Sequence, residues 1–325
     1  MLSATLASTV PGAGAIADLG GQTMGTTWSA RLVLPCGVAL AQAHAGVQRA
    51  LDQVVAQMST WLPGSDICRL NRAPAGWHAV PAELFTVLHA ACELARDTDG
   101  AYDPSAGPLV DLWGFGPRSR GPHLPDAAQI AAARARVDWR RLRLDAGSLR
   151  VWQPGGAELD LSSIAKGYGV DQAAQTLERL GVAHYLVEVG GELRGRGRRP
   201  DGHPWRVAVE LPDDAGMAAV LPLDGWCVAT SGDYRRYFDA GGTRHSHTID
   251  PRTGRPVAHA LASVTVAHAS CMQADALATA LTVLGPEAGM AHARRRGLAA
   301  LFVSRSDTGF ETAATPAFDA LREKE

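Results

Sequence analysis

Few cysteines and no long run of like charge occur in this chain of 325 residues, and each absence excludes a class of protein. The five cysteines are widely spaced and form no Cys-x-x-Cys pair, so neither a disulfide framework nor a zinc knuckle is indicated. The formal net charge is −2 and no long basic run is present, which argues against nucleic acid as a partner. The densest basic stretch, residues 194–199, interleaves four arginines with glycine and is interpreted as a solvated hairpin.

Long hydrophobic runs are missing as well. No window reaches the roughly 18 apolar residues of a membrane-spanning helix, so no transmembrane segment is predicted. The first 22 residues are apolar apart from Asp18 and a few small polar residues, and they lack the basic start, the long apolar run and the lipidatable cysteine of an export signal. We expect residues 1–22 to be a disordered lead-in and the protein to be cytoplasmic. A numbering that omits a signal would fit equally well.

What is present is enough apolar sequence for a large core, since 46% of the residues are hydrophobic. We expect one domain over residues 23–315, with room for a small subdomain at about 117–157, and a tail at 316–325. Apolar periodicity predicts a strand at 26–34 and helices at 41–58 and 82–96. A loop rich in Gly and Pro follows at 100–121, of the kind that borders a ligand.

The second half of the chain predicts a fold class. A hairpin is expected at 141–152 and a helix at 164–180. Strands follow near 185–189, 205–211, 226–230, 243–249 and 262–267, then helices at 273–284 and 286–296 and a strand at 299–303. Most connections between these strands have hairpin length. The sequence therefore predicts an α+β fold, a mixed and largely antiparallel sheet flanked by helices, with the active site in a cleft.

Three segments contain polar and charged residues that the fold alone does not require. Asp275 and Thr279 are four residues apart in a predicted helix, so both oxygens lie on one face, and a carboxylate beside a hydroxyl suits a hard cation such as Mg²⁺. By itself this spacing also fits an amphipathic helix with an exposed polar face. In the segment 158–167, Lys166 lies where a turn would open a helix, a favourable place for phosphate; a surface lysine is the alternative.

The third segment, residues 245–254, contains His245 and His247, which face the same way if they lie in one strand. They could form a zinc pair, although no third His or Cys has a matching spacing. Gly190 and Gly191 follow a strand and allow close backbone approach to a ligand, but they lack the rest of a dinucleotide fingerprint. Cys271 has no surroundings that would lower its pKa, so we do not predict a nucleophile there.

Taken in order, these motifs resemble the FAD:protein FMN transferase (ApbE) family. Its members show a DLxxIAKGxxxD segment, an H-x-IDPxTG segment and an ADALATAL segment, and all three occur here. The resemblance runs from about Met24 to at least Val303. It includes Met24-Gly-Thr-Thr, Ser59-Thr-Trp-Leu-Pro, Gly100-Ala-Tyr-Asp-Pro and the segment 107–116.

The resemblance implies a role for each matching residue. His247 is implied to be the general base, with His245 as a neighbour. The cation is implied to be Mg²⁺, with Mn²⁺ also fitting, and its ligands to be the side chains of Asp275 and Thr279 and the main-chain carbonyls of Ser163 and Ala278. The implied FAD contacts are Met24, Trp61, Ala101, Tyr102, Asp103, Asp160, Lys166 and Ile249.

The implied reaction is a metal-dependent transfer of FMN from FAD to a Ser or Thr hydroxyl of a target flavoprotein, with AMP as the leaving group. FAD and an acceptor flavoprotein with a Ser/Thr motif are the implied partners. A metal-dependent FAD pyrophosphatase and a non-catalytic FAD-binding protein are the alternatives. Many members of the family are exported and held by a lipidated N-terminal cysteine, so a periplasmic or membrane-anchored location is the alternative to the cytoplasm.

Overall fold

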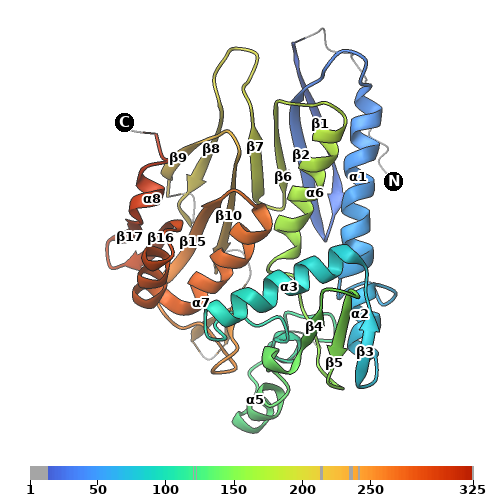
Figure 1. Cartoon of the computed structure of the whole chain (residues 1–325). Helices are drawn as coiled ribbons and strands as arrows, with labels where there is room; N and C mark the ends of the chain where they lie inside the picture. Colours follow the sequence, from blue (N-terminus) through green and yellow to red (C-terminus); the bar gives the residue numbers. More distant parts are fainter. Residues whose placement is uncertain are drawn as a thin grey trace.

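An eight-stranded antiparallel sheet organises the computed structural model, which describes residues 14–119, 121, 123–212, 215–233, 237–240 and 242–323. The strand order is β1-β2-β6-β7-β10-β15-β16-β17 (Figure 1). The strands are β1 (Ile16–Thr23), β2 (Thr26–Val33), β6 (Tyr185–Val189), β7 (Glu192–Arg196), β10 (Trp226–Gly232), β15 (Leu261–His268), β16 (Ala299–Ser306) and β17 (Gly309–Ala314). This confirms the expected sheet flanked by helices.

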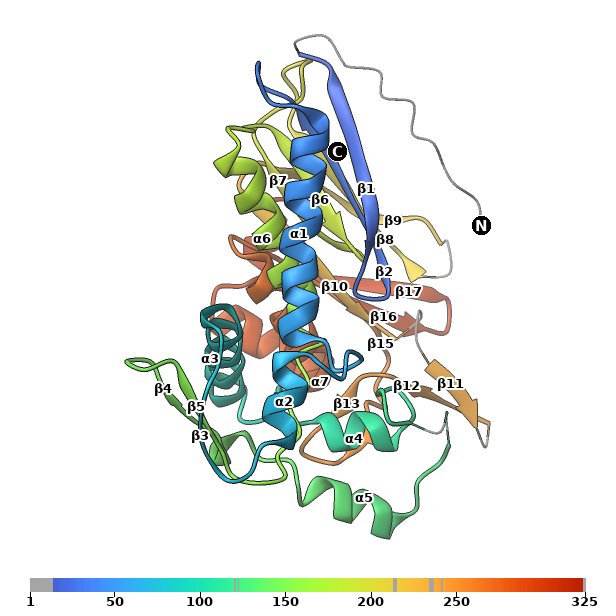
Figure 2. The ribbon, with the colours of Figure 1, turned by 90° about the vertical axis from the view of Figure 1, so that its right-hand side faces the viewer.

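Three long helices, α1 (Leu40–Met58), α6 (Ala165–Arg179) and α7 (Cys271–Arg295), cover one face of the sheet (Figures 1 and 2). A fourth helix, α3 (Ala82–Asp97), packs against α1 and α7. Helix α1 buries Val47, Leu51, Val54 and Met58, a spacing of three or four residues that places them on one stripe. All four helices were predicted, and α7 joins two of the predicted segments across a kink at Gly285, where φ is 83°.

The other face carries the hairpin β8 (Trp205–Glu210) and β9 (Met217–Leu223) and the short helix α8 (Pro316–Asp319). Phe318 of α8 is fully buried against Leu301 and neighbouring apolar residues. The expected tail is therefore wrong for residues 316–323, because Phe318 belongs to the core; residues 324–325 lie outside the described part.

The prediction that residues 1–22 form a disordered lead-in is also wrong for residues 16–22, which belong to β1. Strand β1 pairs with β2 along its whole length, from Ile16 opposite Val33 to Thr23 opposite Thr26. Ala17 and Leu19 alternate toward the core, which is the pattern of a half-buried strand. Residues 1–13 lie outside the described part of the chain.

A smaller region lies beyond the ends of the long helices (Figure 2). It contains α2 (Asp66–Arg72), α4 (Gly107–Leu112), α5 (Ala127–Arg134), η1 (Trp139–Arg141) and a sheet of β3 (Gly76–Ala79), β5 (Arg150–Gln153) and β4 (Arg143–Asp145). The predicted hairpin at 141–152 corresponds to β4 and β5. Residues 117–157 do not make this sheet alone, because β3 pairs with β5.

Short strand pairs complete the structure: β11 (Tyr237–Ala240) with β12 (Thr243–Ser246), and β13 (Ile249–Asp250) with β14 (Arg255–Pro256). The third polar motif runs through β12 and β13 and ends at the turn before β14. Among the described residues, no helix combines the length and apolar character needed to cross a membrane.

Candidate active site

The first turn of α6 lies directly against the first turns of α7. A Cβ atom on Gly167 would overlap the carbonyl oxygen of Cys271 and would lie 2.8 Å from the Cβ of Asp275. The backbone N–H of Gly167 donates a hydrogen bond to Oδ2 of Asp275, with 2.9 Å between nitrogen and oxygen. Two motifs more than 100 residues apart in sequence therefore meet in one hydrogen bond.

An aspartate of α6, Asp171, caps α7. Oδ1 of Asp171 accepts from the N–H of Cys271 at 3.1 Å, and Oδ2 accepts from the N–H of Met272 at 3.0 Å and the hydroxyl of Ser270 at 2.8 Å. A carboxylate at a helix N-terminus satisfies free N–H groups and interacts favourably with the helix dipole. Arg194 lies 2.9 Å from the same carboxylate and is mostly buried, so the solvated hairpin predicted at 194–199 is wrong for this arginine.

Lys166 lies between two buried carboxyl groups. Its Nζ forms an ion pair with Oε1 of Glu192, the first residue of β7. Burial would lower the pKa of Lys166, but the negative charges of Asp275 and Glu192 outweigh burial and raise it. Burial raises the pKa of Asp275, opposed by Lys166 and by the N–H of Gly167. Burial and the charge of Asp275 raise the pKa of Glu192 to about 8, with Lys166 opposing.

The oxygen atoms at this junction suit a divalent cation. Asp275 is 4% exposed, and no described residue donates a hydrogen bond to its Oδ1. The hydroxyl of Thr279, one turn further along α7, lies 2.9 Å from the hydroxyl of Ser231 in β10. The N–H of Gly167 bonds to Asp275 instead of the carbonyl of Ser163, so that carbonyl accepts no hydrogen bond from a described residue. This donor set fits a hard cation.

One predicted ligand fits less well. The carbonyl of Ala278 accepts a hydrogen bond from the hydroxyl of Thr282 at 2.8 Å, within α7. A cation bound there would share or displace that bond. The fit therefore rests on Asp275, Thr279 and the carbonyl of Ser163.

Several of the residues predicted to contact FAD surround this junction. The hydroxyl of Ser163 donates to the hydroxyl of Tyr102 at 3.1 Å, and burial raises the pKa of Tyr102. The N–H of Asp160 donates to the carbonyl of Pro104 at 2.8 Å, which joins the loop 101–104 to the motif 158–167. Ala101 and Tyr102 are almost fully buried, so Tyr102 has little ring surface to stack on a flavin.

Two more of these residues have clear positions. Asp103 holds its own loop, because Oδ1 accepts from the N–H and hydroxyl of Ser105 and Oδ2 accepts from the N–H of Trp139. Met24 lies in the β1–β2 turn with φ of 49°, and its Cε would be 2.8 Å from a Cβ on Gly169 of α6. Met24 thus covers the start of the helix that carries Lys166.

The third motif packs in an aromatic cluster with Trp113, Phe115 and Phe238. The ring of His247 lies 6.2 Å, centroid to centroid, from Phe115, edge to face. His245 stacks on Trp113 at 5.7 Å and on Phe238 at 5.0 Å. His245 is therefore a packing residue and not half of a zinc pair. Within the described ranges, no group of three or more His, Cys, Asp or Glu side chains is placed to hold a metal.

The segment 100–116, predicted as a loop but containing the helix α4, connects the two groups of residues. Tyr102, near its start, contacts Ser163, and the indole N–H of Trp113, near its end, donates to the carbonyl of Gly254 at 2.9 Å. Ile249 packs with Leu109 and Trp113 in the aromatic cluster. Trp61 is 61% exposed in the loop after α1, where its ring is accessible.

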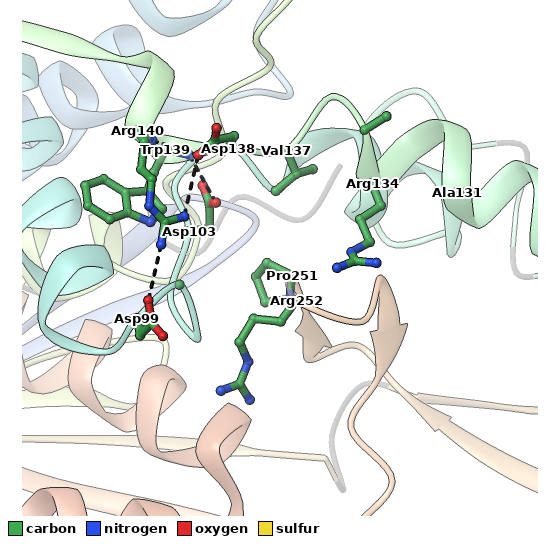
Figure 3. Close-up of a pocket in the computed structure, with 12 residues that line it drawn as sticks. Asp99, Asp103, Ala131, Arg134, Val137, Asp138, Trp139, Arg140, Pro251 and Arg252 are labelled. Carbon is green, nitrogen blue, oxygen red and sulfur yellow. Dashed lines mark hydrogen bonds and ion pairs between the residues drawn. The ribbon is translucent and has the colours of Figure 1, made fainter.

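A cavity of about 580 Å³ borders the candidate site without coinciding with it (Figure 3). Of the predicted site residues, only Asp103 lines it. Its charged side chains are partly neutralised within the wall, since Arg140 lies 3.2 Å from Asp99 and 3.7 Å from Asp138. The chemistry that could act on a pyrophosphate lies instead at the α6–α7 junction.

Sequence reasoning missed Glu192, Asp171 and Ser231. Asp171 ends the DLxxIAKGxxxD segment, so its place in the motif was a usable signal. Glu192 follows Gly190 and Gly191. These glycines predicted a close approach of the backbone to a ligand, but they gave no sign that the side chain of Glu192 would contact Lys166. Nothing in the sequence singles out Ser231. All five cysteines are free, and burial raises the pKa of Cys271 well above its usual value, in line with the prediction that it is not a nucleophile.

The fold and site define an α+β protein with a cation-type donor set and a lysine at the junction of two helix N-termini. The chain belongs to the ApbE family, whose sequence model matches residues 24–302. It is 40% identical over 310 residues to the FAD:protein FMN transferase of Vibrio cholerae, covering 94% of this chain and 92% of that protein. The family resemblance of the motifs is thereby confirmed.

Solved structures agree with this membership. The apo form of the Pseudomonas stutzeri flavinyl transferase ApbE superposes with a TM-score of 0.88 at 44% identity, over 94% of this chain and 96% of that one. The ApbE protein of Thermotoga maritima gives a TM-score of 0.86 at 29% identity, over 95% of this chain and all of that one.

Proposed function

We propose that this protein transfers FMN from FAD to a Ser or Thr hydroxyl of a target flavoprotein and releases AMP. The observation that carries the proposal is the hydrogen bond from Gly167 to Asp275, which joins the motif of Lys166 to the motif of Asp275 and leaves the carbonyl of Ser163 without a donor among the described residues. Membership of the ApbE family and the transferase names of its relatives support the reaction.

Charge neutralisation and alignment dominate the cleavage of a phosphoanhydride. Lys166 supplies a fixed positive charge at the start of α6, where a phosphate is also favoured by the helix N-terminus. Asp275, Thr279 and the carbonyl of Ser163 would hold Mg²⁺; Mn²⁺ suits the same ligand types. When bound, the cation supplies Lewis-acid polarisation of the phosphate oxygens.

His247 is the proposed general base. The acceptor hydroxyl oxygen forms a bond to the FMN phosphorus, the bond from that phosphorus to the bridging oxygen breaks, and AMP leaves with the electron pair. The hydroxyl proton passes to the imidazole of His247. The half-buried position of this ring beside Phe115 leaves room for such a role and fixes the ring on one side. General base catalysis of this kind typically contributes about 10² to 10⁴ in rate.

The test is to incubate the protein with FAD, Mg²⁺ and a flavoprotein fragment that carries a Ser/Thr acceptor motif. AMP release and the mass of the fragment are followed together. An FMN-sized mass increase with one AMP per adduct is the expected result. AMP and free FMN without an adduct would replace the proposal with a pyrophosphatase, and bound FAD without AMP would replace it with a carrier.

A further inference from the structure

Glu192 is a buried carboxyl group that the motifs do not include. It is 2% exposed at the start of β7, directly after the turn of Gly190 and Gly191. Its Oε1 accepts from Nζ of Lys166, whereas Oε2 is buried without a hydrogen-bond partner among the described residues. Burial of a carboxyl with an unpaired oxygen destabilises a fold, so a reason for keeping it is expected in the function.

The same turn fixes the rest of the Lys166 side chain. A Cβ on Gly190 would lie 3.5 Å from Cδ of Lys166 and 2.8 Å from Cγ2 of Thr26. The aliphatic part of the lysine therefore crosses the glycine turn, and its ammonium ends at Glu192. The other carboxylate that attracts this ammonium is Asp275.

We propose that Glu192 is a positioning residue, which holds the ammonium of Lys166 away from Asp275. This rests on the proposed function, in which Lys166 contacts the FAD pyrophosphate and Asp275 binds the cation. Without an acceptor at position 192, the ammonium turns to Asp275, the remaining acidic partner, and competes there with the cation. The contact needs only a hydrogen-bond acceptor, because an ammonium donates to a carboxylate, a carboxylic acid or an amide oxygen alike.

The test compares Glu192→Leu with the conservative Glu192→Gln, which keeps an acceptor oxygen. Binding of Mg²⁺ alone and binding of FAD in saturating Mg²⁺ are measured by calorimetry, and KM for FAD is measured separately from kcat. We expect Glu192→Leu to weaken both affinities and to raise KM about tenfold, with kcat changed by less than about threefold. Glu192→Gln is expected to stay within about threefold of the unmodified protein.

A double-mutant cycle with Lys166→Met shows whether Glu192 acts through the lysine. In the Lys166→Met background, Glu192→Leu is expected to change neither affinity further. Equal losses in both backgrounds would overturn the inference in favour of a direct electrostatic or purely structural role. Unchanged Mg²⁺ and FAD affinities in a folded Glu192→Leu protein would overturn it as well.

Failure of the proposed function gives a different pattern. If the unmodified protein binds no FAD in saturating Mg²⁺, the proposed function and the inference fall together. If it binds FAD and Glu192→Leu binds equally tightly, only the inference falls. Should Glu192→Leu not fold, the Glu192→Gln and Glu192→Ala proteins are compared instead, and a folded Glu192→Ala protein with unchanged affinities overturns the inference.

Discussion

Gly167 and Cys271 are in such close contact that no side chain fits between them. A Cβ at position 167 would overlap the carbonyl oxygen of Cys271 and press on Asp275. The backbone at Gly167 does not have a positive φ, so the glycine is required by the neighbouring helix and not by its own conformation. The close approach is what allows a backbone N–H of one helix to bond to a carboxylate of the other.

Gly167→Ala is therefore expected to separate α6 from α7. Overpacking in a well-packed interior typically costs about 1–3 kcal/mol, and we expect a loss of about 2 kcal/mol in the free energy of unfolding together with loss of Mg²⁺ binding. Denaturant unfolding and calorimetry measure the two effects. Gly64→Ala is the control, because a Cβ there has no atom within 4 Å. A Gly167→Ala protein with unchanged stability and Mg²⁺ affinity would contradict the packing argument.

His247→Ala is expected to reduce FMN transfer by about 10² to 10⁴ while leaving FAD affinity within a few fold, because a base acts in the chemical step. AMP release in single-turnover experiments and FAD binding by calorimetry check the two parts. His245→Gln is the matched control, since this neighbour stacks on Trp113 and Phe238. Equal losses of transfer in both variants would count against His247 as the base.

Asp275→Asn is expected to impair both binding and turnover, unlike the change at His247. The amide lacks the negative charge that a divalent cation requires, so we expect Mg²⁺ affinity to fall at least about 100-fold. Titration with Mg²⁺ alone reports this without any dependence on activity. Asp307→Asn, at an exposed position, controls for the loss of one charge. Retention of Mg²⁺ binding by Asp275→Asn would move the cation site elsewhere.

A histidine far from the junction is expected to make stability depend on pH. His292, near the end of α7, is buried with Nε2 3.2 Å from Oδ2 of Asp97. Burial lowers the pKa of His292, the charges of Arg295 and Arg296 lower it further, and Asp97 opposes them. The unfolded chain therefore binds a proton at a higher pH than the folded one, so stability is lost as pH falls through about 6.5 toward the lowered value.

His292→Gln is expected to remove this dependence. Between pH 7 and 5 the unmodified protein should lose roughly 2 °C more in Tm than the variant. Thermal unfolding followed by circular dichroism at several pH values provides the comparison. Parallel pH curves for the two proteins would show that another group is responsible.

Local patterns in the sequence were sufficient for the long helices, and they also place two of the proposed cation ligands on one helical face. Asp275 and Thr279 lie on one helical turn, so their spacing carries the geometry directly. The same holds for α1, whose apolar stripe predicts its buried face. Strand β1 was missed because its glycines weaken the strand pattern, and its partner β2 supplies the stability that its own sequence does not show.

Contacts between distant segments could not be predicted in this way. Glu192 approaches Lys166 only because β7 is placed beside β6 and β10 in the sheet, and no local pattern encodes that order. Arg194 was assigned to a solvated hairpin because its sequence neighbours are glycine and arginine, yet its partner Asp171 lies on a helix. Phe318 likewise belongs to the core through a sheet face that combines nearby Leu301 with residues as distant in sequence as Val209 and Val228.

The free carbonyl of Ser163 gives the site an uneven sensitivity to mutation. A main-chain oxygen is present whatever residue occupies the position, so natural variation at 163 removes only the hydroxyl contact to Tyr102. This oxygen accepts no hydrogen bond from a described residue, because Gly167 directs its N–H to Asp275. We therefore expect a saturation scan of the chain to find position 163 tolerant and position 167 intolerant, although the proposed cation ligand belongs to the first and the control over it to the second.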